Sequence, residues 1–272
     1  MKHIQSRDNP FFKELVKLAG SARQRRKAQQ TLLDGVHLVQ AHLTSGNKPQ
    51  HLLVAQAALQ GREVAVLLKK LSGVPLTQLD DSLFADLTEL KTPSGILALI
   101  DLPSPVVSAA QSSFCLLLED IQDPGNLGSM LRSAAAAGCD AVFLSKGCAD
   151  AWSPKVLRAG MGGHFALSIH ESADLPAVAA AFQGKLFAAL PDAEINLYDC
   201  DLRGKLAFAL GNEGAGLSEG LLAAVSQHVT IPMPGKVESL NAAAAAAVCL
   251  FEAVRQRQPT RSAKASAKSG SV

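Results

Sequence analysis

The chain has 272 residues and a hydrophobic content of 48%, which suits one or two globular domains. No run approaches the roughly 18 apolar residues of a membrane helix, and the N-terminus lacks the apolar stretch of a secretory signal. We therefore expect a cytoplasmic protein with no membrane partner. The net charge is only +2, yet residues 1–27 carry eight Lys/Arg against two acids.

The C-terminal residues 255–272 carry five Lys/Arg and no acid, which leaves −9 on residues 28–254. Basic ends on an acidic body favour a polyanionic partner. The alternative is a solvated helix face followed by a frayed tail.

The five cysteines are scattered without a CxxC pair, and the seven histidines form no ligand motif. We interpret the cysteines as small buried side chains, and we expect no metal site.

The first hundred residues predict a compact α/β unit. Residues 10–20 have helical spacing, and the basic stretch after them forms either a loop or the start of the next element. From residue 31, strands alternate with helices, which favours a layered α/β arrangement. The expected strands are 31–34, 51–55, 75–79 and 95–100, and the expected helices are 36–46, 62–73 and 80–90.

Residues 101–113 are rich in proline and serine and predict a linker. A second α/β unit follows it. Its continuous apolar runs are typical of buried parallel strands. The expected strands are 114–119, 141–145, 165–170, 185–190, 206–210 and 228–231, with helices at 127–138, 172–182 and 242–254. Residues 258–272 predict a basic, disordered tail.

Three loops of this second unit each follow an apolar run and precede a helix. Ligands bind at such positions in open α/β sheets, at the carboxyl ends of parallel strands. The loop GNEGAGLS (211–218) has glycines that permit close approach of the backbone to a ligand, one charge at Glu213, and a helix-capping serine at Ser218. Its spacing is GxxGxG, so the dinucleotide fingerprint is absent, and no phosphate-binding P-loop occurs.

The other two loops add rigid backbone and one cation. In IPMPGKVESLN (231–241), two prolines stiffen the backbone, and Ser239 or Asn241 can cap the next helix. That helix is so apolar that we expect burial in the core or against another subunit. In DPGNLGSMLRSA (123–134), Asn126 can act as a cap and Gly128 permits close packing. Arg132 requires either a carboxylate partner or an anionic ligand.

Together, these motifs resemble those of the SpoU/TrmH family of the SPOUT class. They are NxGxxxR from Asn126 to Arg132, GNExxGLS from Gly211 to Ser218, and IPMxGxxxSLN from Ile231 to Asn241. The resemblance spans roughly 113–256, and residues 1–100 resemble the L30e-like domain that precedes it in many members. The segment SPKVLRAGMGGHF (153–165) is also similar. The family usually has serine in place of Gly160 and alanine in place of Gly163, so we assign this segment no role.

The resemblance implies an S-adenosylmethionine-dependent RNA ribose 2′-O-methyltransferase. Its fold would be α/β, with a C-terminal SPOUT-type parallel sheet tied in a deep trefoil knot and a smaller L30e-like α/β domain before it. The domains would be 1–105 for RNA substrate binding, 113–257 for methyl transfer, and the tail 258–272. S-adenosylmethionine would lie in the knot, held by Leu210, Gly211, Asn212, Gly216, Ile231, Met233 and Leu240.

The family further implies the residues of the reaction. The catalytic set would be Arg132, Glu213, Ser239, Asn241 and Asn126. Because arginine stays protonated, anchoring a phosphate and polarising the 2′-hydroxyl suit Arg132 better than acting as a base. The RNA contacts would be Arg23, Arg25 and Arg26, and the chain would form a homodimer through the knot region.

Family analogy favours ribosomal RNA over tRNA as the substrate. Two other classes stay open on the sequence alone: a non-catalytic RNA-binding protein with the same fold, and a different α/β enzyme that uses a nucleotide.

Overall fold

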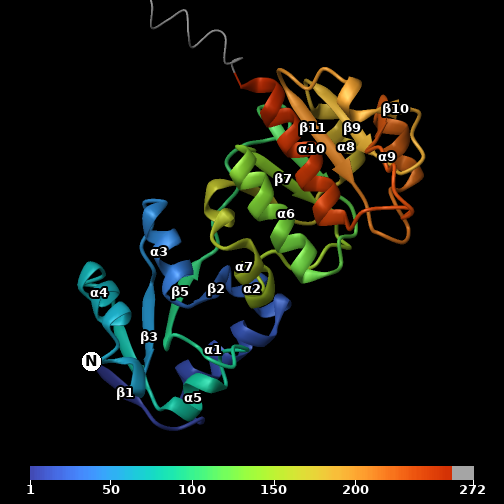
Figure 1. Ribbon diagram of the computed structural model, residues 1–272. Coiled ribbons are helices and arrows are strands. Elements are labelled where there is room, and N and C mark those ends of the chain that lie inside the picture. The colour runs from blue at the N-terminus through green and yellow to red at the C-terminus, as the bar shows by residue number, and fades with distance from the viewer. Residues whose placement is uncertain (259–272) are drawn as a thin grey trace, which may run out of the picture. The chain divides into compact units, whose positions relative to one another are not determined.

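The structure is a computed structural model that describes residues 1–258, so all but the first residue of the predicted tail lies outside it. The chain forms two compact units (Figure 1). The N-terminal unit contains Met1–Ser104, Asp123–Arg132 and Ala149–Ala166. The C-terminal unit contains Pro105–Gln122, Ser133–Cys148 and the residues from Leu167 onward. Two segments of the predicted second domain therefore pack with the first hundred residues.

The N-terminal unit contains a five-stranded sheet in the order β1-β4-β3-β5-β2. Strands β1, β4 and β3 are parallel, and β5 runs antiparallel to β3 and β2. The strands are β1 (Lys2–Ile4), β2 (Gln30–Asp34), β3 (His51–Ala55), β4 (Leu76–Leu79) and β5 (Ile96–Asp101). The helices are α1 (Pro10–Gly20), α2 (Ala22–Ala28), α3 (Val36–Thr44), α4 (Arg62–Lys70) and α5 (Asp81–Ala85).

The predicted alternation of strands and helices is confirmed in this unit, with two additions. The basic stretch forms helix α2, which Ser21 caps at one end and the left-handed residue Gln29 ends at the other. Strand β1 was not predicted because it has three residues, of which only Ile4 is buried. A short η1 turn (Gln56–Ala58) follows β3.

The C-terminal unit contains seven parallel strands in the order β10-β12-β9-β11-β6-β7-β8. This confirms the predicted parallel α/β sheet. The strands are β6 (Phe114–Leu118), β7 (Ala141–Leu144), β8 (Ser168–His170), β9 (Lys185–Ala189), β10 (Ile195–Asn196), β11 (Leu206–Leu210) and β12 (Gln227–Thr230). Strand β11 lies between β6 and β9, so the chain returns to the middle of the sheet after forming β9. The trefoil knot itself stays a prediction.

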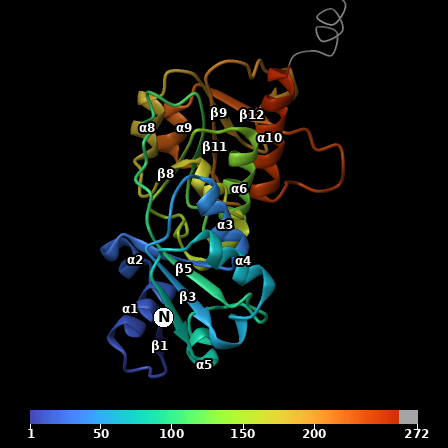
Figure 2. The ribbon, with the colours of Figure 1, turned by 90° about the vertical axis from the view of Figure 1, so that its left-hand side faces the viewer.

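Helices cover both faces of this sheet (Figure 2). Helices α8 (Leu175–Ala181) and α9 (Glu219–Ala224) pack on the face that includes Cys115, Leu117, Ala207 and Ala209. Helix α10 (Ala242–Arg257) lies on the other face, where the Arg257 guanidinium sits 4.0 Å above the Phe114 ring. Strands β6 and β11 are buried along their whole length, which explains their continuous apolar sequences.

The remaining elements are short, apart from α6 (Pro124–Ala137). They are α7 (Pro154–Gly160), η2 (Gly163–Ala166) and η3 (Leu197–Asp199).

Cys115, Cys139 and Cys249 are buried, and all five cysteines are free. Burial raises the pKa of the Cys115 and Cys249 thiols to about 12, so these thiols pack as small side chains. Within residues 1–258, no helix is long and apolar enough to cross a membrane.

His164, in the N-terminal unit, is fully buried beside Trp152. Its Nε2 lies 2.8 Å from the Ala151 carbonyl oxygen, and its Nδ1 has no hydrogen-bond partner among the described residues. Burial lowers the pKa of His164 to about 4. Between pH 6.5 and 4 the unfolded chain binds a proton that the folded chain does not, so the folded state loses stability as the pH falls.

Because of His164, we expect the free energy of unfolding to fall by roughly 3 kcal/mol as the pH drops from 6.5 to about 4. Urea unfolding of the protein and of His164→Gln across this pH range checks the expectation. The free energy of unfolding of His164→Gln should fall less steeply below pH 6.5. Equal slopes for the two proteins would contradict it.

Candidate active site

A cavity of about 460 Å³ lies at the carboxyl ends of β9, β11 and β12. This is the sheet edge where the three predicted loops were expected to bind a ligand. Its walls come from three segments of the C-terminal unit, which follow β9, β11 and β12 in turn. They contribute Ala189–Pro191, Leu210–Leu217, and a third group composed of Thr230, Ile231, Met233, Glu238–Ala242 and Ala245.

The loop after β11 is a compact turn held by hydrogen bonds within the loop. Asn212 Oδ1 accepts hydrogen bonds from the Gly214 and Ala215 amides, at 2.8 and 3.3 Å, and the Gly216 amide donates to the Asn212 carbonyl at 2.9 Å. Gly216 has φ +69°, a left-handed conformation that favours glycine. These contacts fix backbone groups of the loop along one wall of the cavity.

The loop after β6 holds the loop after β11 in place. The Glu119 carboxylate accepts from both the amide and the hydroxyl of Ser218, at 2.7 and 2.8 Å, and Asn212 Nδ2 donates to the Asp120 carbonyl at 3.0 Å. Ser218 also caps α9, as predicted, because its hydroxyl accepts from the Leu221 amide. Sequence reasoning missed Glu119, although an acidic residue directly after a buried strand is a signal worth examining.

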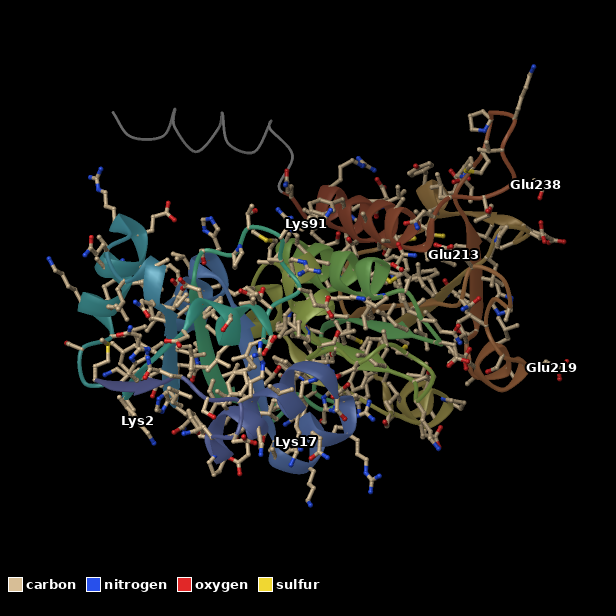
Figure 3. All side chains as sticks on the ribbon, turned by 90° about the horizontal axis from the view of Figure 1, so that it is seen from below. Lys2, Lys17, Lys91, Glu213, Glu219 and Glu238 are labelled. Atoms are coloured by element: carbon tan, nitrogen blue, oxygen red, sulfur yellow. The ribbon has the colours of Figure 1, made fainter. Side chains whose placement is uncertain are left out.

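The third loop (231–241) ends where α10 begins. Asn241 is the cap of α10: its Oδ1 accepts from the Ala243 and Ala244 amides at 3.0 and 3.2 Å. Glu213 of the second loop is joined to this cap, because its Oε1 accepts from Asn241 Nδ2 at 2.8 Å and from the Ala242 amide at 3.1 Å. In Figure 3, Glu213 lies nearer the sheet than Glu238, whose loop projects outward.

The structure therefore brings the second and third motifs together around one cavity. All seven residues predicted to hold a cofactor line it, together with Glu213, Ser239 and Asn241. The wall formed by Ala189–Pro191 was not predicted. Its loop follows a strand at the same sheet edge but has no cluster of glycines, so only the sheet topology could have identified it.

The first motif, Asn126 to Arg132, lies on the part of α6 that belongs to the N-terminal unit. The prediction that Asn126 caps this helix is wrong. The helix begins at Pro124, and Asp123 Oδ1 accepts the Asn126 amide at 2.7 Å, so Asn126 lies in the first turn. Arg132 is exposed and forms no ion pair within residues 1–258. Of the two partners predicted for Arg132, a carboxylate is not found among residues 1–258, which leaves an anionic ligand.

The structure removes Arg25 from the expected RNA-contacting set. Arg25 is 4% exposed, and its Nε and Nη2 donate to Asp150 at 2.8 and 2.5 Å. Its Nη1 donates to the carbonyls of Leu18 and Ala19. A guanidinium held in this way cannot reach a phosphate without leaving its buried carboxylate unpaired, which is costly. Arg23 and Arg26, on the same helix, are exposed.

The charge of the cavity limits what it can hold. Its lining includes Glu213 and Glu238 but no lysine or arginine. Such walls are unsuited to the phosphates of a dinucleotide or a nucleoside triphosphate, because they present two carboxylates and no cation. They suit a ligand that carries positive charge, such as a sulfonium. Within residues 1–258, no cluster of His, Cys, Asp and Glu could hold a metal ion.

The fold and the cavity thus define an α/β protein with a ligand site at the carboxyl ends of parallel strands. The model of the SpoU rRNA methylase family matches residues 113–251, and that of the MRM3-like substrate-binding domain matches residues 9–98. The 23S rRNA (guanosine(2553)-2′-O)-methyltransferase RlmP of Bacillus subtilis is 32% identical over 254 residues, 92% of this chain and 98% of that protein.

Human mitochondrial rRNA methyltransferase 3 is 34% identical over 292 residues, covering 85% of this chain and 69% of that protein. Among solved structures, the SpoU methyltransferase AviRb of Streptomyces viridochromogenes, in complex with AdoMet, aligns with a TM-score of 0.79 and 27% identity. That alignment covers 92% of this chain and 99% of the other. The chain belongs to the SpoU rRNA methylase family.

Proposed function

We propose that this protein transfers a methyl group from S-adenosylmethionine to a ribose 2′-hydroxyl of ribosomal RNA. The observation that carries the proposal is the cation-free cavity built from the second and third family motifs. A relative of nearly equal length is named a 23S rRNA 2′-O-methyltransferase, and a solved relative holds AdoMet. The same cavity disfavours the rival enzyme that uses a nucleotide, because no lysine or arginine lines it.

The residues around the cavity suit this cofactor. S-adenosylmethionine supplies an electrophilic methyl group on sulfur, and the protein supplies alignment. Backbone groups of Leu210–Asn212 and Gly216 would hold one part of the cofactor. Ile231, Met233 and Leu240 would contact its remaining parts. The carboxylates of Glu213 and Glu238 place negative charge around a site for a positively charged sulfonium.

Arg132 is proposed to act on the RNA. Its guanidinium carries five N–H donors and lacks a carboxylate partner among residues 1–258, so it can anchor a phosphate and polarise the 2′-hydroxyl. Asn126, Glu213, Ser239 and Asn241 complete the proposed catalytic set on the strength of the family motifs. Arg23 and Arg26, exposed on α2, are proposed to contact RNA phosphates, which give affinity without sequence preference.

A homodimer is proposed through α10. Ala244 and Phe251 are exposed on this helix, Phe251 by 47%, and Ala247, Val248 and Val254 are partly exposed. These side chains recur at helical spacing and form an apolar stripe beside the buried face of the helix. The trefoil knot remains a prediction from the family, and the cytoplasmic location remains a prediction from the sequence.

The function is tested with purified protein, tritium-labelled S-adenosylmethionine, and 23S rRNA and tRNA transcripts supplied separately. Incorporation into rRNA, at a nucleotide whose ribose then resists alkaline cleavage on its 3′ side, supports the proposal. Incorporation into tRNA alone would make the protein a tRNA methyltransferase. Absence of incorporation into either RNA, with S-adenosylmethionine bound, would favour the non-catalytic RNA-binding protein.

We expect Glu213→Ala to lower turnover more than cofactor affinity. The carboxylate joins the glycine loop to the first turn of α10, so its loss removes the acceptor of Asn241 Nδ2 and of the Ala242 amide. We expect a drop in kcat of roughly 100-fold, the scale for one lost polar contact at a reacting centre. Calorimetric titration with S-adenosylmethionine should show a change of less than about tenfold. Equal losses in kcat and affinity would assign Glu213 a structural role.

A further inference from the structure

The segment Ala149–Ala166 is part of the N-terminal unit, although it lies between two strands of the C-terminal sheet in sequence. Three contacts hold it there. Asp150 forms the buried ion pair with Arg25 of α2, Thr31 Oγ1 of β2 donates to the Trp152 carbonyl at 2.8 Å, and His42 of α3 packs edge-on against Phe165. These contacts fix α7 on the unit that carries the basic helix α2 (Figure 1).

The inner face of α7 packs directly on α6. A Cβ added at Gly128 would lie 2.4 Å from the Ala159 Cβ, 2.7 Å from the Val156 carbonyl oxygen and 3.0 Å from the Gly160 nitrogen. Gly128 lies between Asn126 and Arg132, so the stretch of α6 that carries the proposed catalytic side chains packs closely against α7. Residues on α7 therefore pack against the stretch of α6 that leads to Arg132.

The outer face of α7 carries two cations. Lys155 is 59% exposed and Arg158 41% exposed, and both lie at the outer limit of an ion pair with Glu89, at 3.9 and 3.8 Å. Glu89 is itself 51% exposed. Exposed pairs at such distances add little to stability, so the two cations can exchange this carboxylate for another anion.

We propose that α7 binds the RNA backbone, with Lys155 and Arg158 releasing Glu89 to contact phosphates that flank the target nucleotide. The inference rests on the proposed function, since it takes Arg132 as the residue that meets the target ribose. It assigns a role to the segment SPKVLRAGMGGHF, which the three motifs leave without one. Glu89 then competes with RNA for the two cations, so its removal and theirs have opposite effects on RNA affinity.

The test measures binding of the full-length protein to a radiolabelled 23S rRNA transcript, by filter retention at several KCl concentrations. Lys155→Ala combined with Arg158→Ala should weaken binding roughly tenfold at low salt and make the salt dependence of log Kd shallower by about 1 to 2. Glu89→Gln should strengthen binding roughly threefold. Lys185→Ala and Asp201→Asn break another exposed pair, 2.8 Å long, and should change neither quantity.

If the ion pair only stabilises the fold of α7, Glu89→Gln and the cation variants should all weaken RNA binding. That pattern, or an unchanged affinity and salt slope in the double variant, would overturn the proposal. The single variant Lys155→Ala keeps Arg158, whose charge acts on Asp34. It therefore tests the proposal even if the double variant folds poorly. Methyl transfer by the unmodified protein is measured in parallel. Its absence counts against the proposed function, whereas unchanged RNA binding in active variants counts only against α7.

Discussion

Replacing Arg132 with alanine should slow methyl transfer roughly 100- to 1,000-fold while leaving S-adenosylmethionine binding intact. Arg132 is exposed on α6, among small and apolar side chains, and it has no carboxylate partner within residues 1–258. Because no ion pair among residues 1–258 involves this guanidinium, we infer that its partner is an anionic substrate. Removal of one such donor from a reacting centre costs roughly 100- to 1,000-fold in kcat. Single-turnover transfer of labelled methyl groups to 23S rRNA measures the loss.

Two further variants locate the cause of that loss. Arg132→Lys keeps the charge but lacks the planar pair of donors, so it should recover only part of the rate. Arg62→Ala removes an arginine from the first turn of α4 and should leave the rate unchanged. Full activity in Arg132→Ala would exclude the proposed role. A loss of cofactor affinity equal to the loss of rate would show that Arg132 supports the cavity instead.

The central strands of both sheets could be predicted because a strand that is buried on both faces has a continuous run of apolar residues. The edge strands β1 and β10 were missed for the opposite reason. β1 has three residues and β10 has two, and most of their side chains face solvent. Their pairing depends on β4 and β12, which lie far away in the chain. Local periodicity carries no information about such partners.

The three arginines of α2 show that amino-acid composition does not predict which basic side chains are exposed. Arg23, Arg25 and Arg26 have the same chemistry in the sequence, yet only Arg25 is buried. The difference comes from Asp150, which is 125 residues away and is brought to α2 by packing of the segment Ala149–Ala166. The cavity was more predictable, because glycine and proline loops after parallel strands converge at one sheet edge whatever their separation in sequence.

Replacing Gly211 with alanine should weaken S-adenosylmethionine binding by forcing open one wall of the cavity. A Cβ at this position would lie 2.1 Å from the Gly216 carbonyl oxygen, 2.3 Å from its carbon and 2.8 Å from the Leu217 nitrogen. All three are backbone atoms, so no side chain can rotate away. The turn from Asn212 to Leu217 must open, and it is this turn that forms one wall of the cavity.

The expected loss of affinity is roughly 10- to 100-fold, the equivalent of about 1–3 kcal/mol of overpacking. Gly235→Ala is the matched control, because a Cβ there has no atom within 4 Å and the same chemical change is made in the neighbouring loop. Calorimetric titration of both variants with S-adenosylmethionine measures the difference. Equal affinities would mean that the turn opens without cost to the bound cofactor, and the Gly211–Gly216 backbone contact would then not shape the site.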